Sequence, residues 1–320
     1  MSLGCRAMIY HGRGQPWIIH AYRGLDRMTL HSFLDWLRAE VGRRAPEVSY
    51  CQPDDPLIRQ LFVRAIERLT GQPRLQRIYD EYNRTRGPDD NFWQSAVSWL
   101  QLKIRYDGRR LENVPADGPL IVIANHPYGV LDGIAVSYLT SLVRKDFKLL
   151  AHETFGRAEP LRPYLIPITF DGASSAVRQN VEAKKTALRH LGDGGSIVIF
   201  PAGRVSTASN VFGRATDAPW KLFAGKLIAT SNATVVPMFT EGQNGFMFHL
   251  GSRFSEALRD ALLLREVARR IGADVTAHIG TPIQSSELKS WTDRQALLDH
   301  LRDIVYCLDP TVSKRLDAVD

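Results

Sequence analysis

Beyond residue 106, short apolar runs alternate with longer stretches of helical periodicity. The runs read LIVIA from residue 120, FKLLA from 147, YLIPITF from 164, SIVIF from 196, TVVPMF from 234 and DVTAHIG from 274. Uninterrupted apolar runs are typical of strands covered on both faces, and their alternation with helices favours parallel connections. The pattern predicts an α/β fold with a central, mostly parallel or mixed sheet flanked by helices.

Capping signals mark several helices between these runs. Gly192 suits the C-terminal end of one helix, and Asp217 is expected to cap another over residues 217–228. The last helix has a capping-box signal, Thr292 followed three residues later by Gln295, and it should end before Pro310.

The first 106 residues have helical rather than strand periodicity. One helix is expected over 28–41. A second is expected with Asp55 as its cap, Pro56 in its first turn and one apolar stripe made by Leu57, Ile58, Leu61, Phe62, Ile66 and Leu69. A more polar helix over 71–84 and an aromatic one from 91 follow. We therefore divide the chain into a lead segment and helical unit (1–106), an α/β domain (107–310) and a C-terminal tail (311–320).

The charge of the chain favours anionic partners. Lys and Arg number 41 against 34 Asp and Glu, which gives a net charge of +7 and a pI of about 9.4. Phospholipid surfaces, nucleic acid and phosphorylated substrates would all suit this charge. The basic residues are scattered and form no recognisable nucleic-acid module, so we expect no nucleic-acid partner.

The apolar content indicates a globular protein that meets a membrane only peripherally. Hydrophobic residues make up 44% of 320 positions, enough for a substantial core. The N-terminal residues lack the apolar stretch of a secretory signal, and the uncharged run 227–240 is shorter than the roughly 20 residues of a spanning helix. Cys5, Cys51 and Cys307 lie far apart and indicate a reducing compartment. The helix from 91, with Phe92, Trp93 and Trp99, fits a core helix better than one lying in lipid headgroups.

The stretch IVIANHPYGVLDG contains the first candidate chemistry. His126 follows a predicted strand, in the position where parallel sheets commonly bind ligands, and Asp132 could fold back to orient its ring as a general base. Pro127 and Gly129 would shape the loop between them. The alternative is that Asp132 only caps the following helix. We expect no metal site here, because only His152 and Glu153 are further ligand types and no spacing links them to His126.

A second stretch, SIVIFPAGRVS, follows another predicted strand. Backbone amides near Gly203 and the guanidinium of Arg204 would suit an anionic group such as phosphate. A plain turn with a solvated arginine is the alternative.

These two stretches together resemble the motifs of a known family. NHPYGVLDG resembles the first motif of the glycerophospholipid (lysophospholipid or 1-acylglycerol-3-phosphate) acyltransferases, which is asparagine, histidine, four residues and aspartate. IFPAGRVS resembles their phenylalanine-proline-glutamate-glycine motif, in the same order and about 70 residues later. RRLENVPADGPLIVIANHP and TVVPMFTEG extend the resemblance over roughly residues 107–285.

The resemblance implies transfer of a fatty acyl group from acyl-CoA or acyl carrier protein to a lysophospholipid or related lyso-lipid, without a metal or other cofactor. His126 would deprotonate the acceptor, Asp132 would orient His126, and amides near Gly133 would stabilise the oxyanion. Arg157 is the nearest counterpart of the family's phosphate-binding arginine. The other implied substrate-binding residues are Asn125, Tyr128, Gly203 and Arg204. The enzyme would lie on a membrane surface, at its cytoplasmic face.

The chain departs from the family pattern at two positions. Five residues instead of four separate His126 from Asp132, a spacing that resembles a hemolysin-like or ornithine-lipid branch. Ala202 replaces the glutamate of the second motif, and Arg204 could instead bind a different acidic head group. Two alternatives stay open: a thioesterase or lipid hydrolase using the same dyad, and a non-catalytic lipid-binding protein with this fold.

Overall fold

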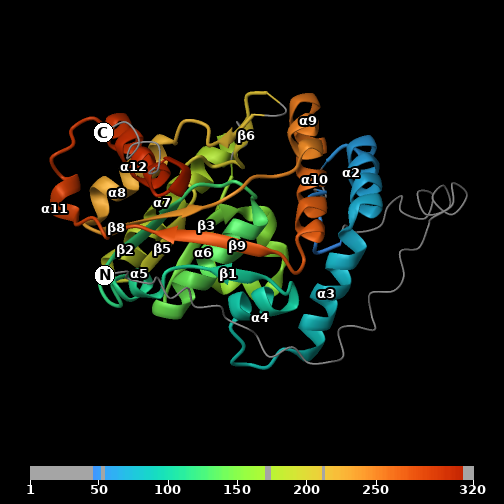
Figure 1. Ribbon diagram of the computed structural model, residues 1–320, viewed down its shortest axis with the longest axis horizontal. Coiled ribbons are helices and arrows are strands. Elements are labelled where there is room, and N and C mark those ends of the chain that lie inside the picture. The colour runs from blue at the N-terminus through green and yellow to red at the C-terminus, as the bar shows by residue number, and fades with distance from the viewer. Residues whose placement is uncertain (1–45, 52–54, 170–173, 211–212, 313–320) are drawn as a thin grey trace, which may run out of the picture.

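A central sheet of seven strands organises the computed structural model, which describes residues 46–51, 55–169, 174–210 and 213–312 (Figure 1). The strand order is β1-β9-β8-β2-β5-β3-β4, and neighbours run parallel except β8 and β9. The strands are β1 (Lys103–Arg105), β2 (Leu120–Ala124), β3 (Lys148–His152), β4 (Leu165–Ile168), β5 (Ser196–Ile199), β8 (Thr234–Thr240) and β9 (Asp274–Ile279). The predicted mostly parallel α/β sheet is confirmed. The helix expected over 28–41 lies outside the described residues.

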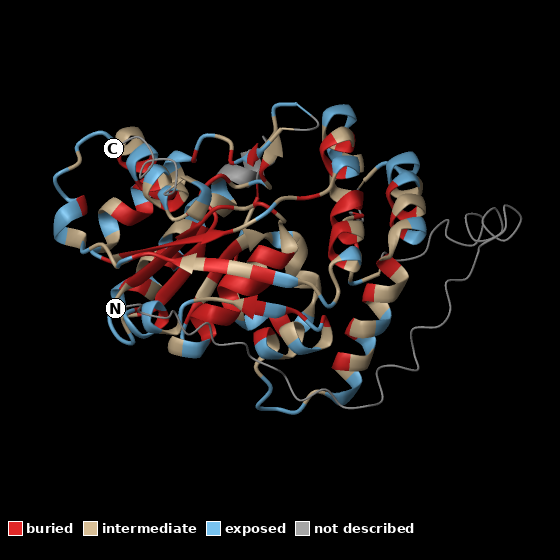
Figure 2. Ribbon diagram, viewed as in Figure 1, coloured by how far each residue is buried: buried red, intermediate tan, exposed pale blue. Residues whose placement is uncertain are grey.

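Helices cover both faces of this sheet because its central strands carry apolar side chains on both faces. In β2, Leu120, Val122 and Ala124 pack toward α4 (Phe92–Trp99), α6 (Val130–Val143) and α10 (Glu256–Arg269). Ile121 and Ile123 pack toward α7 (Ser174–Gly192), α8 (Leu222–Ser231) and α12 (Arg294–Cys307) on the opposite face. Figure 2 shows the central strands and α6 as the buried part of the molecule.

The N-terminal helices share the core of the sheet domain. Trp93 of α4 is buried and its ring meets Phe147 and Tyr164, so the expectation of a core helix rather than a membrane contact agrees with its burial. Strand β1 forms the edge of the sheet beside β9, and Ile104 belongs to the same hydrophobic cluster as Leu120. The boundary expected at 106/107 therefore does not coincide with a break in the core.

Helices α2 (Leu57–Thr70) and α3 (Gln72–Thr85) pack against α10, but four of the six residues in the predicted apolar stripe of α2 are exposed. Its buried residues are Val63, Arg64 and Glu67. Ile58 and Leu69 are 84% and 62% exposed, and Leu57 and Phe62 are also exposed. The buried face of α2 is instead polar: the Glu67 carboxylate accepts from the Ser49 hydroxyl and from the Tyr50 amide.

Helix starts differ from the predicted caps by a few residues. Pro56, not Asp55, is the N-cap of α2, and the Asp55 carboxylate pairs with Arg59 instead. The α12 N-cap is Asp293 rather than Thr292. Helix α8 begins after Lys221, so Asp217 does not cap it.

Several short elements had no counterpart in the sequence prediction. These are α5 (Gly108–Glu112), the 3-10 helices η2 (Glu153–Arg157) and η3 (Glu159–Tyr164), the antiparallel ribbon β6 (Thr207–Ala208) and β7 (Ala215–Thr216), α9 (Phe246–Phe254) and α11 (Ser285–Leu288), together with the longer α10. Among the described helices, none combines the length and apolarity needed to cross a membrane.

Candidate active site

Three neighbouring strands bring the two motif loops together. β8, β2 and β5 lie side by side and parallel, so their carboxyl ends meet at one edge of the sheet. His126 follows β2, the loop from Phe200 to Ser206 follows β5, and Thr240 ends β8. This is where ligand sites of open α/β sheets occur.

His126 and Asp132 contact each other directly. Nδ1 of His126 lies 2.9 Å from Oδ2 of Asp132, whose side chain is fully buried, while the histidine side chain remains 17% exposed. A carboxylate at Nδ1 fixes the tautomer that carries the proton there and leaves Nε2 as the acceptor. No hydrogen bond to Nε2 occurs within the described part of the chain. The pair can therefore act as a base and its orienting carboxylate.

Gly129 makes this contact compatible with the longer spacing. Its φ of 87° lies in the left-handed region, and it is the N-cap of α6. A Cβ on Gly129 would lie 2.8 Å from Cγ2 of Val205, so the loop also passes close to the second motif. Asp132 consequently falls in the first turn of α6 and is not its N-cap.

The surroundings of His126 hold the ring and favour its charged form. Phe200 stacks on the imidazole with ring centroids 4.2 Å apart, and the amide of Ser206 donates to the His126 carbonyl at 2.8 Å. Burial lowers the pKa of His126, but the carboxylates of Asp132 and Asp217 more than offset it, so the net pKa is raised. His126 is thus a stronger base than an ordinary histidine.

Asn125 and Gly133 serve the frame of the loop rather than an open substrate surface. The buried Asn125 amide donates to the Thr240 carbonyl at 2.9 Å and accepts from the Thr240 amide at 2.7 Å. The Gly133 amide donates to Oδ1 of Asp132 at 3.1 Å. We therefore correct the expectation that Asn125 binds substrate and that the Gly133 amide is directed at an oxyanion.

Tyr128, in the loop between His126 and Asp132, lies against three residues. The guanidinium of Arg270 lies over its ring at 4.6 Å, and Asn244 donates to its carbonyl at 3.3 Å. Gly242, with φ of 99°, leaves the space for the phenol, because a Cβ there would lie 1.9 Å from its oxygen. Tyr128 as a whole is half-buried.

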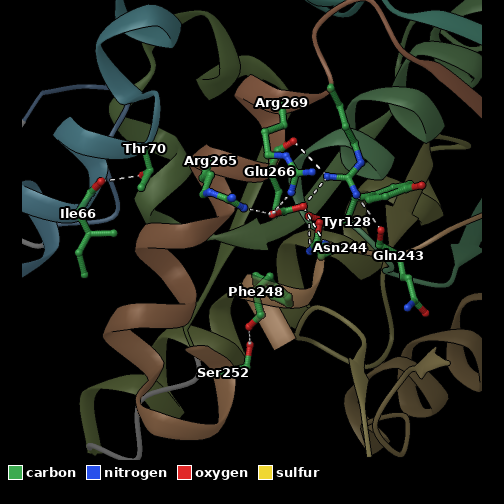
Figure 3. A network of polar contacts seen from close by, with 12 residues as sticks. Ile66, Thr70, Tyr128, Gln243, Asn244, Phe248, Ser252, Arg265, Glu266 and Arg269 are labelled. Atoms are coloured by element: carbon green, nitrogen blue, oxygen red, sulfur yellow. Dashed lines mark hydrogen bonds and ion pairs between the residues drawn. The ribbon is translucent and has the colours of Figure 1, made fainter. Parts of the chain in front are cut away.

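A buried ion cluster on α10 supports this arrangement (Figure 3). The Glu266 carboxylate accepts from Arg270 at 2.6 Å, from Arg265 at 3.0 Å and from the Gly245 amide at 2.8 Å, and Arg269 lies 3.6 Å away. Burial raises the pKa of Glu266, but the hydrogen bonds from Arg270 and Gly245 outweigh it and lower the pKa overall. The ionised carboxylate thus fixes Arg270 beside Tyr128.

The second motif forms a tight turn with one exposed cation. Gly203 has φ of 67°, and its amide donates to the Phe200 carbonyl at 3.0 Å. Arg204 is exposed and lies near Lys221, whose pKa is lowered by burial and by this neighbouring charge. Ala202 is buried in the cluster that contains α8. An anion could meet Arg204 at this turn, whereas position 202 only packs.

Arg157 was expected at the acceptor's phosphate but contacts the N-terminal segment. Its guanidinium donates to the carbonyl of Cys51 at 2.5 Å and more weakly to that of Ser49 at 3.4 Å. It therefore ties η2 to that segment.

His152 Nδ1 contacts the Thr154 hydroxyl at 2.7 Å, and the described residues contain no group of three His, Cys, Asp or Glu that could hold a metal.

Comparison with known proteins decides the family. The family model described as "Acyltransferase" matches residues 87–314, which is more than half of the chain. The chain belongs to the acyltransferase family. It is therefore an acyltransferase of lipid metabolism, and the resemblance to glycerophospholipid acyltransferases is confirmed. The comparisons thus support an acyltransferase over the alternative of a non-catalytic lipid-binding protein with this fold.

Two curated relatives and one solved structure are similar to this acyltransferase. A lyso-glycine lipid O-acyltransferase of Phocaeicola vulgatus is 28% identical over 229 residues, covering 68% of this chain and 77% of the relative. One of Bacteroides thetaiotaomicron is 26% identical over 262 residues, covering 78% and 91%. The crystal structure of the 1-acyl-sn-glycerophosphate (LPA) acyltransferase PlsC from Thermotoga maritima has a TM-score of 0.43 and 15% identity, covering 86% of this chain and 91% of that one.

Sequence reasoning missed several residues that frame the acyltransferase site. Phe200 and Ser206 stood within the second motif but were given no role. Asp217 was assigned to a helix cap. Arg270 and Glu266 lie on a helix that was not predicted, so no local signal linked them to the histidine loop.

Proposed function

We propose that this acyltransferase transfers a fatty acyl group from acyl-CoA or acyl carrier protein to a hydroxyl group of a lyso-lipid, with His126 as general base and Asp132 as its orienting carboxylate. The observation that carries the proposal is the 2.9 Å contact between Nδ1 of His126 and Asp132, at a partly exposed imidazole. The raised pKa of His126, reached against the effect of burial, supports the same role.

The proposed reaction is a single acyl transfer. Nε2 of His126 takes the proton of the acceptor hydroxyl while the hydroxyl oxygen attacks the carbonyl carbon of the donor thioester. A new C–O bond forms, the C–S bond breaks, and the proton passes from the imidazolium to the departing thiolate. Asp132 stabilises the imidazolium in between. This route needs no cofactor.

We propose a lyso-lipid with an acidic head group as the acceptor. Both curated relatives are named lyso-glycine lipid O-acyltransferases, and a glycine head group ends in a carboxylate. The exposed Arg204 at the turn after β5 offers paired donors to such an anion, while the buried Ala202 supplies no carboxylate there. Arg204→Ala should mainly raise the acceptor's KM, and an unchanged KM would remove Arg204 from the site.

We propose that the enzyme reaches this acceptor as a peripheral protein at the cytoplasmic face of the membrane, through the exposed apolar stripe of α2. Ile58, Phe62 and Leu69 face outward there, with the exposed Arg59 and Arg68 beside them. Apolar side chains mixed with cations suit an anionic lipid surface. Ile58→Asp with Phe62→Asp should reduce sedimentation with anionic vesicles, whereas Val181→Asp, an exposed position on α7, should not.

Purified protein given labelled acyl donor and a panel of lyso-lipids tests the central proposal, with products identified by mass. His126→Ala should lower kcat by about 10² to 10⁴, the usual contribution of a general base. His300→Ala, on the exposed side of α12, is the matched control and should keep wild-type activity. Unchanged transfer by the His126 variant would overturn the mechanism. Fatty acid released at the same rate without any acceptor would identify a thioesterase or lipid hydrolase instead.

A further inference from the structure

A second buried carboxylate, Asp217, lies behind the main chain of His126. Oδ1 of Asp217 accepts from the His126 amide at 3.1 Å and from the Ser206 hydroxyl at 2.5 Å. Oδ2 accepts from the Trp220 indole at 3.0 Å. Asp217 is only 4% exposed, and burying a carboxylate is costly unless donors of this kind satisfy it.

Ser206 completes the hold on His126. Its amide donates to the His126 carbonyl at 2.8 Å while its hydroxyl donates to Asp217. Both main-chain polar groups of His126 are therefore bound by this pair of residues. The loop after β2, which contains the first motif, is joined in this way to the loop after β5, which contains the second.

Helix α12 in turn fixes Asp217. The Asp217 amide donates to the Tyr306 hydroxyl at 2.7 Å, and Arg302 donates to the Asp217 carbonyl at 3.1 Å. The Arg302 guanidinium also lies 4.9 Å from the centre of the Tyr306 ring. Trp220, the third donor to the carboxylate, is fully buried between the sheet and α8. Helix α12 thus holds the main chain of Asp217, while Trp220, in the segment before α8, holds its carboxylate together with His126 and Ser206.

We propose that Asp217 is a positioning residue for the acyl-transfer reaction: with Ser206 it fixes the His126 main chain where the imidazole meets Asp132, and it places a second negative charge behind that ring. The inference rests on the proposed role of His126 as the base. A reacting geometry that shifts by about 1 Å can cost about 10² in rate, so an anchor on the main chain of the base has a direct effect on kcat.

The charge of Asp217 gives this role a signature that a merely structural residue lacks. Two carboxylates act on the His126 ring, Asp132 from α6 and Asp217 from the segment before α8, and Phe200, which stacks on the ring, is uncharged. Arg302 and Tyr306 face Asp217 from α12. Both carboxylates raise the pKa of His126, so removing one charge lowers it.

Asp217→Asn keeps the size of the side chain and removes its charge. Relative to wild type, kcat should fall by about 10- to 100-fold with both KM values nearly unchanged, and the acid limb of the kcat profile should move to lower pH. Asp309→Asn is the matched control, because Asp309 is also a buried carboxylate: it accepts from the amide and hydroxyl of Thr311 at 2.8 and 2.7 Å and pairs with Arg214. That control should lower the melting temperature without changing kcat or its pH profile.

Titration of the His126 imidazole by NMR separates this inference from the proposed function. The imidazole resonance of His126 is identified because it is missing from the spectrum of His126→Gln. In Asp217→Asn this resonance should titrate at lower pH than in the wild-type protein. The measurement does not depend on turnover. A wild-type titration and kcat in Asp217→Asn would overturn the role of Asp217, while undiminished turnover by His126→Ala would overturn the function itself. If Asp217→Asn does not fold, Ser206→Ala replaces it: reduced kcat at constant KM supports the anchor, and a wild-type kcat overturns it.

Discussion

Asp132→Asn should lower kcat far more than its small change in size suggests. The Asp132 carboxylate is fully buried, and its Oδ2 lies 2.9 Å from Nδ1 of His126. A charge pair about 4 Å apart is worth about 4 kcal/mol at an effective dielectric constant of about 20. This energy is available only when the imidazole becomes positive during proton transfer, so its loss corresponds to a fall in kcat of about 10³.

The pH profile gives the same prediction a second test. Since Asp132 contributes to the raised pKa of His126, the neutral base is populated in wild type only above that raised pKa. In Asp132→Asn the pKa falls, so the acid limb of kcat/KM moves to lower pH and the deficit relative to wild type is smaller at low pH than at high pH.

The assay is steady-state acyl transfer across the range from acid to alkaline pH, with the melting temperature recorded for each variant. The amides of Tyr128 and Gly133 also donate to Asp132, at 3.4 and 3.1 Å, so a stability loss of about 1 to 3 kcal/mol is expected in addition. A folded Asp132→Asn variant with kcat within about threefold of wild type would refute the general-base assignment, as would a large loss of kcat with an unmoved acid limb.

Two further substitutions test the frame of the site and a buried group away from it. Gly242→Ala should raise the acceptor KM and lower the melting temperature, because its Cβ would lie 1.9 Å from the Tyr128 oxygen. The double variant Gly242→Ala with Tyr128→Phe should recover part of both losses. Equal defects in the single and the double variant would contradict this steric cause. Glu67, whose pKa burial raises from 4.5 to about 7, binds more protons in the folded than in the unfolded state between these values, so wild-type stability should fall as pH rises through this window. Glu67→Gln should therefore be more stable than wild type at pH 8, by about 3 kcal/mol, and show no gain at pH 4 in denaturant titrations. A gain that does not depend on pH would rule out ionisation as the cause.

The sequence predicted the sheet well because its central strands carry a signal in every residue. LIVIA at 120 and IVIF at 197 are apolar at consecutive positions, and the structure buries both strands between two helical layers. β1 and the β6–β7 ribbon were missed because three or two residues are too few to show a period. In helix α2 the apolar stripe does not identify the buried face, because two of the three buried residues, Arg64 and Glu67, are charged.

The candidate site was predictable only where its residues lie close together along the chain. His126 and Asp132 belong to one loop, and the structure brings them into contact. Asp217 lies 91 residues after His126, whose amide donates to it, so no local motif could link the two residues. The position of Asp217 before a helix favoured a capping role instead. For Arg157, a loose motif match suggested a phosphate site, and it could not reveal that Nη1 donates to the carbonyls of Ser49 and Cys51.

The fifth residue between His126 and Asp132 changes the surroundings of the dyad and leaves the dyad contact intact. The left-handed Gly129 returns Asp132 to the ring, and the longer loop places Tyr128 against Gly242 and Arg270. Arg270 stays there because the buried Glu266 neutralises it, so this cation costs the site little stability. Both carboxylates that act on His126 are buried behind it, whereas Arg204 is exposed on the adjoining loop. The proposal of an anionic head group therefore rests on a cation that is open to solvent and on carboxylates that are not.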